Sequence, residues 1–260
     1  MRWNDTPVIF RDLTALTKSL HLFAGLAIWE FLTNVLFDWR ILIGKRKRRW
    51  TFWVYLLCRT SSVISACLVL RAIDATSNVG CEAILVPGLL FAVAAFLSSS
   101  FLVLMRLIAI WDRNRWILMV GSVIWLVNFP VVVYDYTVVR GSFDPLIRGC
   151  VVTHSAGTLT AYVTFLVTEI SLLSLMFAGL LRPSMPRSSS IWQTLYVQGW
   201  AWLLLALVAE VPTLVLLCLN LNDAMNLVLQ TPAMLTMSIG ASRMYRSLSR
   251  SAREVYDTAK

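Results

Sequence analysis

The stretch ILVPGLLFAVAAFLSSSFLVLMRLIAIW, residues 84–111, decides the fold class of this chain. Its only charged side chain is that of Arg106. A helix of about 20 apolar residues is long enough to cross the hydrocarbon core of a bilayer. This segment therefore predicts a membrane-spanning helix and not the core of a soluble domain.

The composition of the whole chain agrees with this segment. Of the 260 residues, 58% are hydrophobic and 14% are charged, and the mean hydropathy is +0.71. A soluble domain is about one-quarter charged and just under half apolar. We therefore predict an integral protein of the plasma membrane or an endomembrane. The lipid bilayer is its first partner, and no part of the chain is left over for a nucleic-acid-binding domain.

Charge clusters divide the sequence into seven apolar segments, each of which predicts one transmembrane helix. The predicted spans are Leu20–Ile43, Trp50–Ile73, Ile84–Trp111, Trp116–Val139, Leu159–Leu181, Ile191–Leu219 and Ala224–Ser242. The expected fold is an all-α bundle of seven transmembrane helices over residues 20–242. It is preceded by a tail (residues 1–19) and followed by a basic tail (residues 243–260).

The positions of lysine and arginine predict the orientation of the bundle. Fifteen of the 23 basic residues fall within residues 40–49, 113–115, 182–187 and 243–260, all on one side of a seven-span arrangement. Because basic loops face the cytoplasm, we expect the N-terminus outside and the C-terminus inside. The sequon that begins at Asn4 fits a glycosylated outside tail.

The basic tail has two interpretations. Met244, Leu248, Ala252 and Val255 recur at helical spacing, with arginines between them. Such a segment predicts a short amphipathic helix that lies on the anionic inner leaflet. The alternative is an extension of the last transmembrane helix with solvated charges.

Cys81 and Cys150 both fall on the predicted outer side, at the mouth of the third span and in the loop after the fourth. Disulfides persist in that oxidising environment. We expect the two to form a disulfide that holds the loop of residues 140–158 over the outer opening.

Ionisable side chains inside a span are costly, so they pair with each other or line a cavity. Glu30, Arg59, Glu169 and Glu210 are the candidates. By depth, Arg59 can pair with either Asp38 or Glu30, whereas Glu169 and Glu210 are the best candidates for a ligand or proton pocket.

The sequence argues against an enzyme. His21 and His154 are its two histidines, its lysines lie outside the spans, and it contains no nucleophile–base motif. We therefore expect no catalytic residues, no metal and no cofactor.

Several motifs resemble a family of multi-pass membrane proteins that is expanded in mushroom-forming basidiomycete fungi. The most specific are Ala209-Glu-Val-Pro212, Leu219-Asn-Leu-Asn-Asp223, Gln230-Thr-Pro232 and Arg243-Met-Tyr-Arg246. The resemblance covers nearly the whole chain. It implies the fold and a fungal origin but supplies no mechanism.

A looser resemblance is to G-protein-coupled receptors. It rests on seven spans, an outside N-terminus, the Cys81 and Cys150 pair, and the position of Arg106. Met105 stands where those receptors carry an acidic residue, and Asp112-Arg113 comes one or two turns late. The likeness therefore implies the topology, with Arg106, Asp112 and Arg113 as candidates for cytoplasmic coupling.

These patterns favour a receptor-like protein with an outward-facing pocket for a small molecule and a cytoplasmic signalling partner. The alternative is a carrier or channel for ions or small solutes that uses Glu30, Arg59, Glu169 and Glu210 as a polar path. A scaffold without a ligand is the third possibility.

Overall fold

The computed structural model describes residues 6–43, 50–74, 80–112, 114–138, 140–144, 149–153, 158–181 and 190–258. The helices are α1 (Thr6–Thr33), α2 (Val35–Leu42), α3 (Trp50–Ile73), α4 (Cys81–Ile110), α5 (Arg115–Leu126), α6 (Asn128–Val138), α7 (Leu159–Leu180), α8 (Ser190–Leu219), α9 (Asp223–Leu227) and α10 (Gln230–Thr258). Strands β1 (Arg140–Asp144) and β2 (Gly149–Thr153) form an antiparallel hairpin. Helices dominate the described residues, which confirms the predicted all-α class apart from this hairpin.

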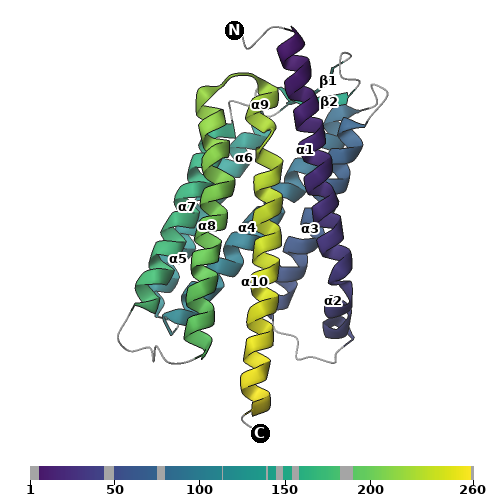
Figure 1. Cartoon of the computed structure of the whole chain (residues 1–260). Coiled ribbons are helices and arrows are strands. Elements are labelled where there is room, and N and C mark those ends of the chain that lie inside the picture. Colours follow the sequence, from purple (N-terminus) through teal and green to yellow (C-terminus); the bar gives the residue numbers. More distant parts are fainter. Residues whose placement is uncertain are drawn as a thin grey trace.

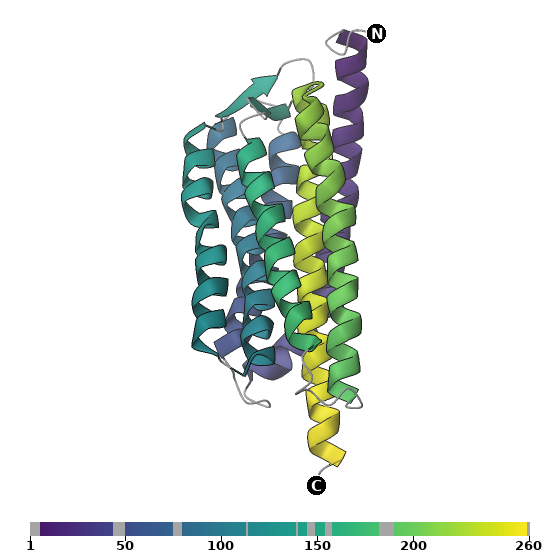
Figure 2. The same cartoon turned by 90° about the vertical axis from the view of Figure 1, so that its left-hand side faces the viewer.

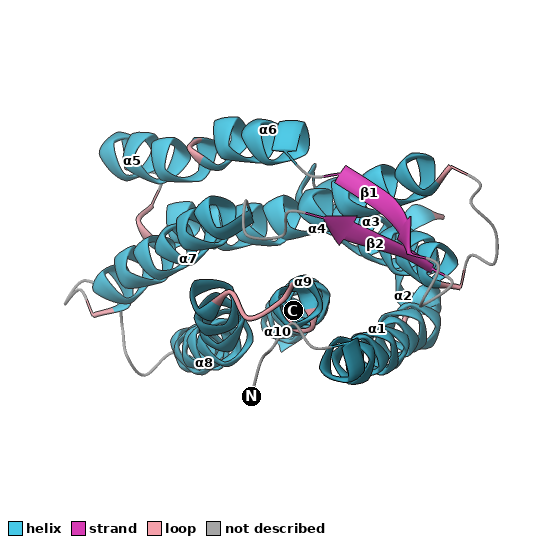
Figure 3. Ribbon diagram, turned by 90° about the horizontal axis from the view of Figure 1, so that it is seen from above, coloured by secondary structure: helices cyan, strands magenta, loops and turns pink. Residues whose placement is uncertain are grey.

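The long helices lie side by side in three layers (Figures 1 and 3). Helices α5 and α6 form one outer layer, α3, α4 and α7 form the middle layer, and α1, α8 and α10 form the other outer layer. The β1–β2 hairpin covers one end of the bundle, here called the hairpin end. At the other end, here called the basic end, α10 carries Arg243 and Arg246 and extends beyond its neighbours (Figure 2).

Five segments are long and apolar enough to cross a membrane: Trp50–Ile73, Cys81–Ile110, Arg115–Asp135, Leu159–Leu180 and Tyr196–Leu219. A sixth arises if α1 and α2, which meet at a bend of 45°, count as one broken span. Helix α10 is not among these segments. It packs against α1, α3, α4 and α8, and its polar residues Gln230, Ser238, Ser242 and Arg246 are buried among them.

Helix α1 begins at Thr6, well before the predicted start of the first span at Leu20. Its early part is amphipathic, and Leu13, Leu16 and Leu20 pack together with Ala224 of α9. Asp12 accepts a hydrogen bond of 2.9 Å from the Asn222 side chain. Packing against α9 therefore extends the helix into the segment predicted to be a tail.

The predicted fourth span is interrupted between α5 and α6, near Val127. Pro130 has no backbone N–H and leaves the carbonyl of Leu126 without its helical donor. The two helices present large apolar side chains to the surroundings, including Trp116 at 76% exposure and Val133 at 64%. Such a face is suited to lipid.

Within the described residues, the tail does not form a separate helix. Residues 243–258 instead continue α10, as the alternative interpretation of the tail expected. The physical reason lies at Arg243, Tyr245 and Arg246. The two arginines bind Glu30 and the tyrosine ring stacks on Tyr55, so the start of the tail is fixed by the bundle.

Helices α3 and α4 approach each other closely because small residues line their contact. A Cβ atom added at Gly88 would lie 3.3 Å from Leu68 Cβ. The Ser65 hydroxyl donates a hydrogen bond of 2.8 Å to the Gly88 carbonyl across the same contact. This contact helps to place α4 at the centre of the bundle.

Candidate functional site

An ionic cluster, made of Glu30, Asp38, Tyr55, Arg59, Arg243 and Arg246, lies towards the basic end. Its first pair is formed by Arg59 of α3 and Asp38 of α2, both buried. The Tyr55 hydroxyl donates a further hydrogen bond of 2.9 Å to Asp38. Of the two partners predicted for Arg59, the structure therefore shows Asp38.

The bend between α1 and α2 explains why an arginine stands at position 59. Where a helix breaks, its last carbonyl groups lose their helical donors. The Arg59 guanidinium donates to the carbonyls of Glu30 (3.0 Å) and Phe31, and it lies 4.8 Å from the centre of the Phe31 ring. One side chain thus neutralises Asp38 and caps the broken helix.

The second ion pair of the cluster joins the two ends of the sequence. One oxygen of Glu30 accepts from Arg246, and the other accepts from Arg243 at 2.7 Å. The Arg246 side chain is 7% exposed and that of Arg243 is 68% exposed. The sequence identified Glu30 as an intramembrane acid but assigned both arginines to the tail, so this contact was not predicted.

Tyr55 connects the two pairs. Its hydroxyl accepts from Arg59 at 3.0 Å and from Arg246 at 3.4 Å while it donates to Asp38. Its ring stacks on Tyr245 with the ring centres 4.6 Å apart. Helices α2, α3 and α10 are therefore joined through one buried phenol.

Glu169 lies in the middle of the bundle and is fully buried. The Ser100 hydroxyl of α4 donates to one of its oxygens, and the Trp202 indole of α8 donates to the other at 3.1 Å. These donors satisfy the carboxyl group. Glu169 therefore holds three helices together and does not line either of the two cavities described for the bundle.

Glu210 of α8 lies closer to the hairpin end and is 3% exposed. Neither of its carboxyl oxygens has a hydrogen-bond partner among the described residues. It interacts electrostatically with Tyr162 of α7, as does Asp135 of α6. The predicted pair of Glu169 and Glu210 thus divides into a satisfied acid and an unsatisfied one.

A cavity of about 50 Å³, here called the outer cavity, lies between α4, α6, α7 and α10 towards the hairpin end. Asp135, Tyr162 and Gln230 are part of its wall, and most of the remaining wall is apolar. Asp135 Oδ1 and Gln230 Oε1 are buried and accept no hydrogen bond from the described residues. Asp135 and Gln230 were not among the predicted site residues, because nothing in the sequence shows that two helix ends enclose one cavity.

Arg106 is buried near the basic end of α4, at 8% exposure. It donates to Gln198 Oε1 at 3.3 Å, and the Gln198 amide donates to the Ser247 hydroxyl at 3.0 Å. Arg106 has no ion-pair partner within the described part of the chain, which makes it unlike Arg59. Asp112 is exposed with a positive φ of 50°. Arg113 and Asn4 lie outside the described residues, as do most of the basic residues of 40–49 and 182–187.

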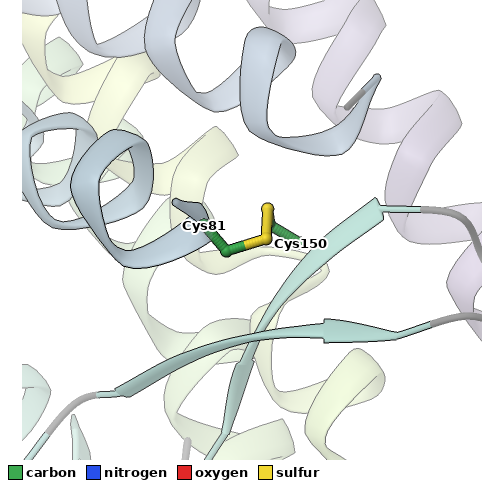
Figure 4. Close-up of a disulfide and its surroundings, with 2 residues drawn as sticks. All are labelled: Cys81 and Cys150. Atoms are coloured by element: carbon green, nitrogen blue, oxygen red, sulfur yellow. A yellow bond between two sulfur atoms is a disulfide. The ribbon is translucent and has the colours of Figure 1, made fainter. Parts of the chain in front are cut away.

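The predicted disulfide is present. Cys81, the first residue of α4, is bonded to Cys150 of β2, with a Cα–Cα distance of 5.5 Å (Figure 4). The hairpin follows directly after α6, the helix that carries Asp135, so the bond ties that helix end to α4. Among the described residues, no group of three or more His, Cys, Asp or Glu side chains is placed to hold a metal ion.

Comparison with protein families, with curated proteins and with solved structures gives no match to this chain.

Proposed function

We propose that the chain crosses the membrane seven times, with the hairpin end outside and the basic end in the cytoplasm. Six spans come from the apolar segments when α1 and α2 are counted together. Helix α10 is the seventh, because it runs from the hairpin end to the basic end among other helices and needs no apolar surface towards lipid. The helix connections at the basic end and the last part of the chain together carry most of the arginines and lysines, which supports this orientation.

We further propose that the protein is receptor-like, with the outer cavity as its ligand site and the basic end as its signalling face. One observation carries this proposal. Helix α10 lines the outer cavity with Gln230 and Met234, and the same helix enters the ionic cluster with Arg243 and Arg246. A ligand that shifts the outer end of α10 therefore acts on the ion pairs at its inner end.

A carrier is the second candidate, favoured by serines in the middle of the bundle. The buried serines are Ser61, Ser62 and Ser65 of α3, Ser98, Ser99 and Ser100 of α4, and Ser238 and Ser242 of α10. Three of them, Ser62, Ser238 and Ser242, line the cavity beside Glu30 and Arg59. The outer cavity shares no wall residue with the cavity of about 10 Å³ beside Glu30 and Arg59, which supports the receptor over the carrier.

Coupling between the two ends of α10 is the property to test. In a Gln230→Cys variant, peptide mass spectrometry gives the rate at which methyl methanethiosulfonate modifies the introduced thiol. Adding Glu30→Gln, which removes the carboxylate of the ionic cluster, should change that rate at least about fivefold, the lower limit of typical allosteric coupling.

Two control variants make this result specific. Asp74→Cys places a thiol at an exposed position at the end of α3, and its modification rate should not respond to Glu30→Gln. Arg115→Gln removes an exposed charge at the basic end and should not alter the rate at the Gln230→Cys thiol. An unchanged rate in the Glu30→Gln background would refute the receptor-like mechanism and favour a scaffold.

A further inference from the structure

The outer cavity has two buried acceptor oxygens that receive no hydrogen bond from the described residues. Its polar wall residues are Asp135, Thr158, Tyr162 and Gln230, and it has no Lys, Arg or His among the described residues that line it. Asp135 Oδ1 and Gln230 Oε1, on two different helices, receive no hydrogen bond within the described part of the chain, whereas the Tyr162 hydroxyl donates to the Gln230 carbonyl at 3.3 Å. A buried acceptor that is left unpaired costs free energy, and a carboxylate costs the most. A ligand that fits this cavity must therefore donate hydrogen bonds, and a cationic donor is the best partner for the Asp135 carboxylate.

The size of the cavity limits that donor. A cavity needs about 10–15 Å³ to hold one water molecule. The 50 Å³ of the outer cavity therefore hold about three to five atoms the size of a water oxygen. Cavities that hold drug-sized ligands are several times larger. The occupant is thus a group of a few heavy atoms, or the end of a longer molecule.

The rest of the wall distinguishes an organic cation from a metal ion. Hard metal ions prefer about six oxygen ligands, whereas this cavity has two unpaired side-chain acceptors. Leu89, Val93, Val132 and Met234 suit an alkyl group instead. The rings of Tyr162 and Phe165, 6.2 Å apart, both line the cavity and favour a positive charge over an aromatic face.

The ionisable groups near Tyr162 also bear on the charge of the ligand. Glu210 interacts electrostatically with Tyr162 and has no donor of its own among the described residues. Two carboxyl groups and no basic group therefore interact electrostatically with Tyr162 within the described structure, which disfavours an anionic ligand.

We propose that the outer cavity binds a small primary ammonium group, with its N–H donors on Asp135 and Gln230 and its alkyl part against the apolar wall. This inference rests on the proposed function in that it takes the receptor's ligand site to be this cavity. It names the chemical class of the ligand that the receptor recognises.

Ethylammonium chloride is the probe, added to the purified full chain in neutral detergent at constant ionic strength. The thermal unfolding midpoint should rise with saturation, and the dissociation constant should be no tighter than about 0.5 mM, the ceiling for three heavy atoms. Asp135→Asn should weaken binding at least about tenfold, since it removes the charge and keeps the shape. Glu82→Gln removes an exposed charge at the same end of the bundle and should bind as the wild type does.

A second variant and three control compounds test the proposal even if Asp135→Asn does not fold. Gln230→Glu adds a second carboxylate to the wall and should tighten binding. Tetramethylammonium, which has no N–H donor, should raise the midpoint less than ethylammonium does, and ethanol, which has no charge, should leave it unchanged. An equal response to ethanol would overturn the ammonium assignment in favour of a neutral ligand. An equal response to sodium ion would overturn it in favour of a metal cation.

The coupling test and the binding test fail separately. If ethylammonium binds but Glu30→Gln leaves the modification rate unchanged, the ammonium site stands and the receptor mechanism fails. If the modification rate changes but ethylammonium gives no midpoint shift, the receptor mechanism stands and the ammonium assignment fails.

Discussion

Arg243 and Arg246 stand one helical turn apart on α10 and share the carboxylate of Glu30, but they differ in burial. The side chain of Arg246 is 7% exposed and also contacts Tyr55, whereas that of Arg243 is 68% exposed. Breaking a buried ion pair by removing one partner costs about 3–5 kcal/mol, whereas an exposed pair contributes about 0–1 kcal/mol. Arg246→Gln should therefore lower the free energy of unfolding by about 3 kcal/mol, at the low end because Arg243 remains beside Glu30. Arg243→Gln should lower it by less than about 1 kcal/mol.

The assay is reversible unfolding in mixed micelles by titration with SDS, followed by circular dichroism. The two variants are matched, because they make the same substitution on the same helix opposite the same acid. A third variant, Glu30→Gln, leaves Arg246 buried without its ion-pair partner and should cost as much as Arg246→Gln or more.

The double variant Glu30→Gln/Arg246→Gln gives the sharpest result. It removes both buried charges, so it should be more stable than Glu30→Gln alone by at least about 1 kcal/mol. Equal costs for Arg243→Gln and Arg246→Gln would refute the claim that burial sets the strength of this contact. Additive costs in the double variant would refute the ion pair itself.

Three further changes probe other parts of the bundle. Arg106→Gln removes a buried charge without a carboxylate partner in the described structure, so the thermal midpoint in neutral detergent should stay the same or rise. Gly240→Ala places a Cβ atom 2.4 Å from Leu205 Cδ2 and should lower the free energy of unfolding by about 1–3 kcal/mol in the SDS titration. Its control is Gly25→Ala, where the added atom meets nothing within 4 Å and should not destabilise. Cys150→Ser should cost about 2–5 kcal/mol, and adding a reductant should lower the wild type to the same stability and leave the variant unchanged.

Spans bounded by charged residues could be predicted from the sequence. The predicted Trp50–Ile73 and Leu159–Leu181 agree with α3 and α7 to within one residue. Charged residues mark the ends of these segments, and a hydropathy profile identifies the apolar residues between them. The Cys81–Cys150 disulfide was predictable for a related reason, since these two cysteines fall on the same side of the predicted spans.

Helices α1 and α10 were predicted less well. Hydropathy compares each side chain with lipid, so it placed Arg243 and Arg246 outside the bundle. Their carboxylate partner is more than 200 positions away in the sequence, in α1. The early start of α1 has the same cause, because its polar residue Asp12 is held by Asn222 of the α8–α9 connection.

The outer cavity could not have been predicted from residue types. Asp135 and Gln230 stand near the ends of α6 and α10, where polar residues are common in any membrane protein. What sets them apart is that each has a buried oxygen without a donor, and this depends on how four helices pack. Glu169 is the opposite case. The sequence predicted it to line a ligand pocket, but in the packed bundle Ser100 and Trp202 donate hydrogen bonds to its carboxyl group.

Helix α10 meets different chemistry at its two ends, and this asymmetry makes it the element that can respond to a ligand. At the basic end, Arg243 and Arg246 are held by Glu30 and Tyr55. At the hairpin end, the Gln230 side chain has an acceptor oxygen that no described donor satisfies. A donor that enters the cavity stabilises only the positions of α10 in which Gln230 can bind that donor. The ion pairs stabilise only the positions of α10 in which Arg246 contacts Glu30. If the two sets of positions differ, filling the cavity must weaken the ion pairs, and weakening the ion pairs must change the affinity of the cavity by the same factor.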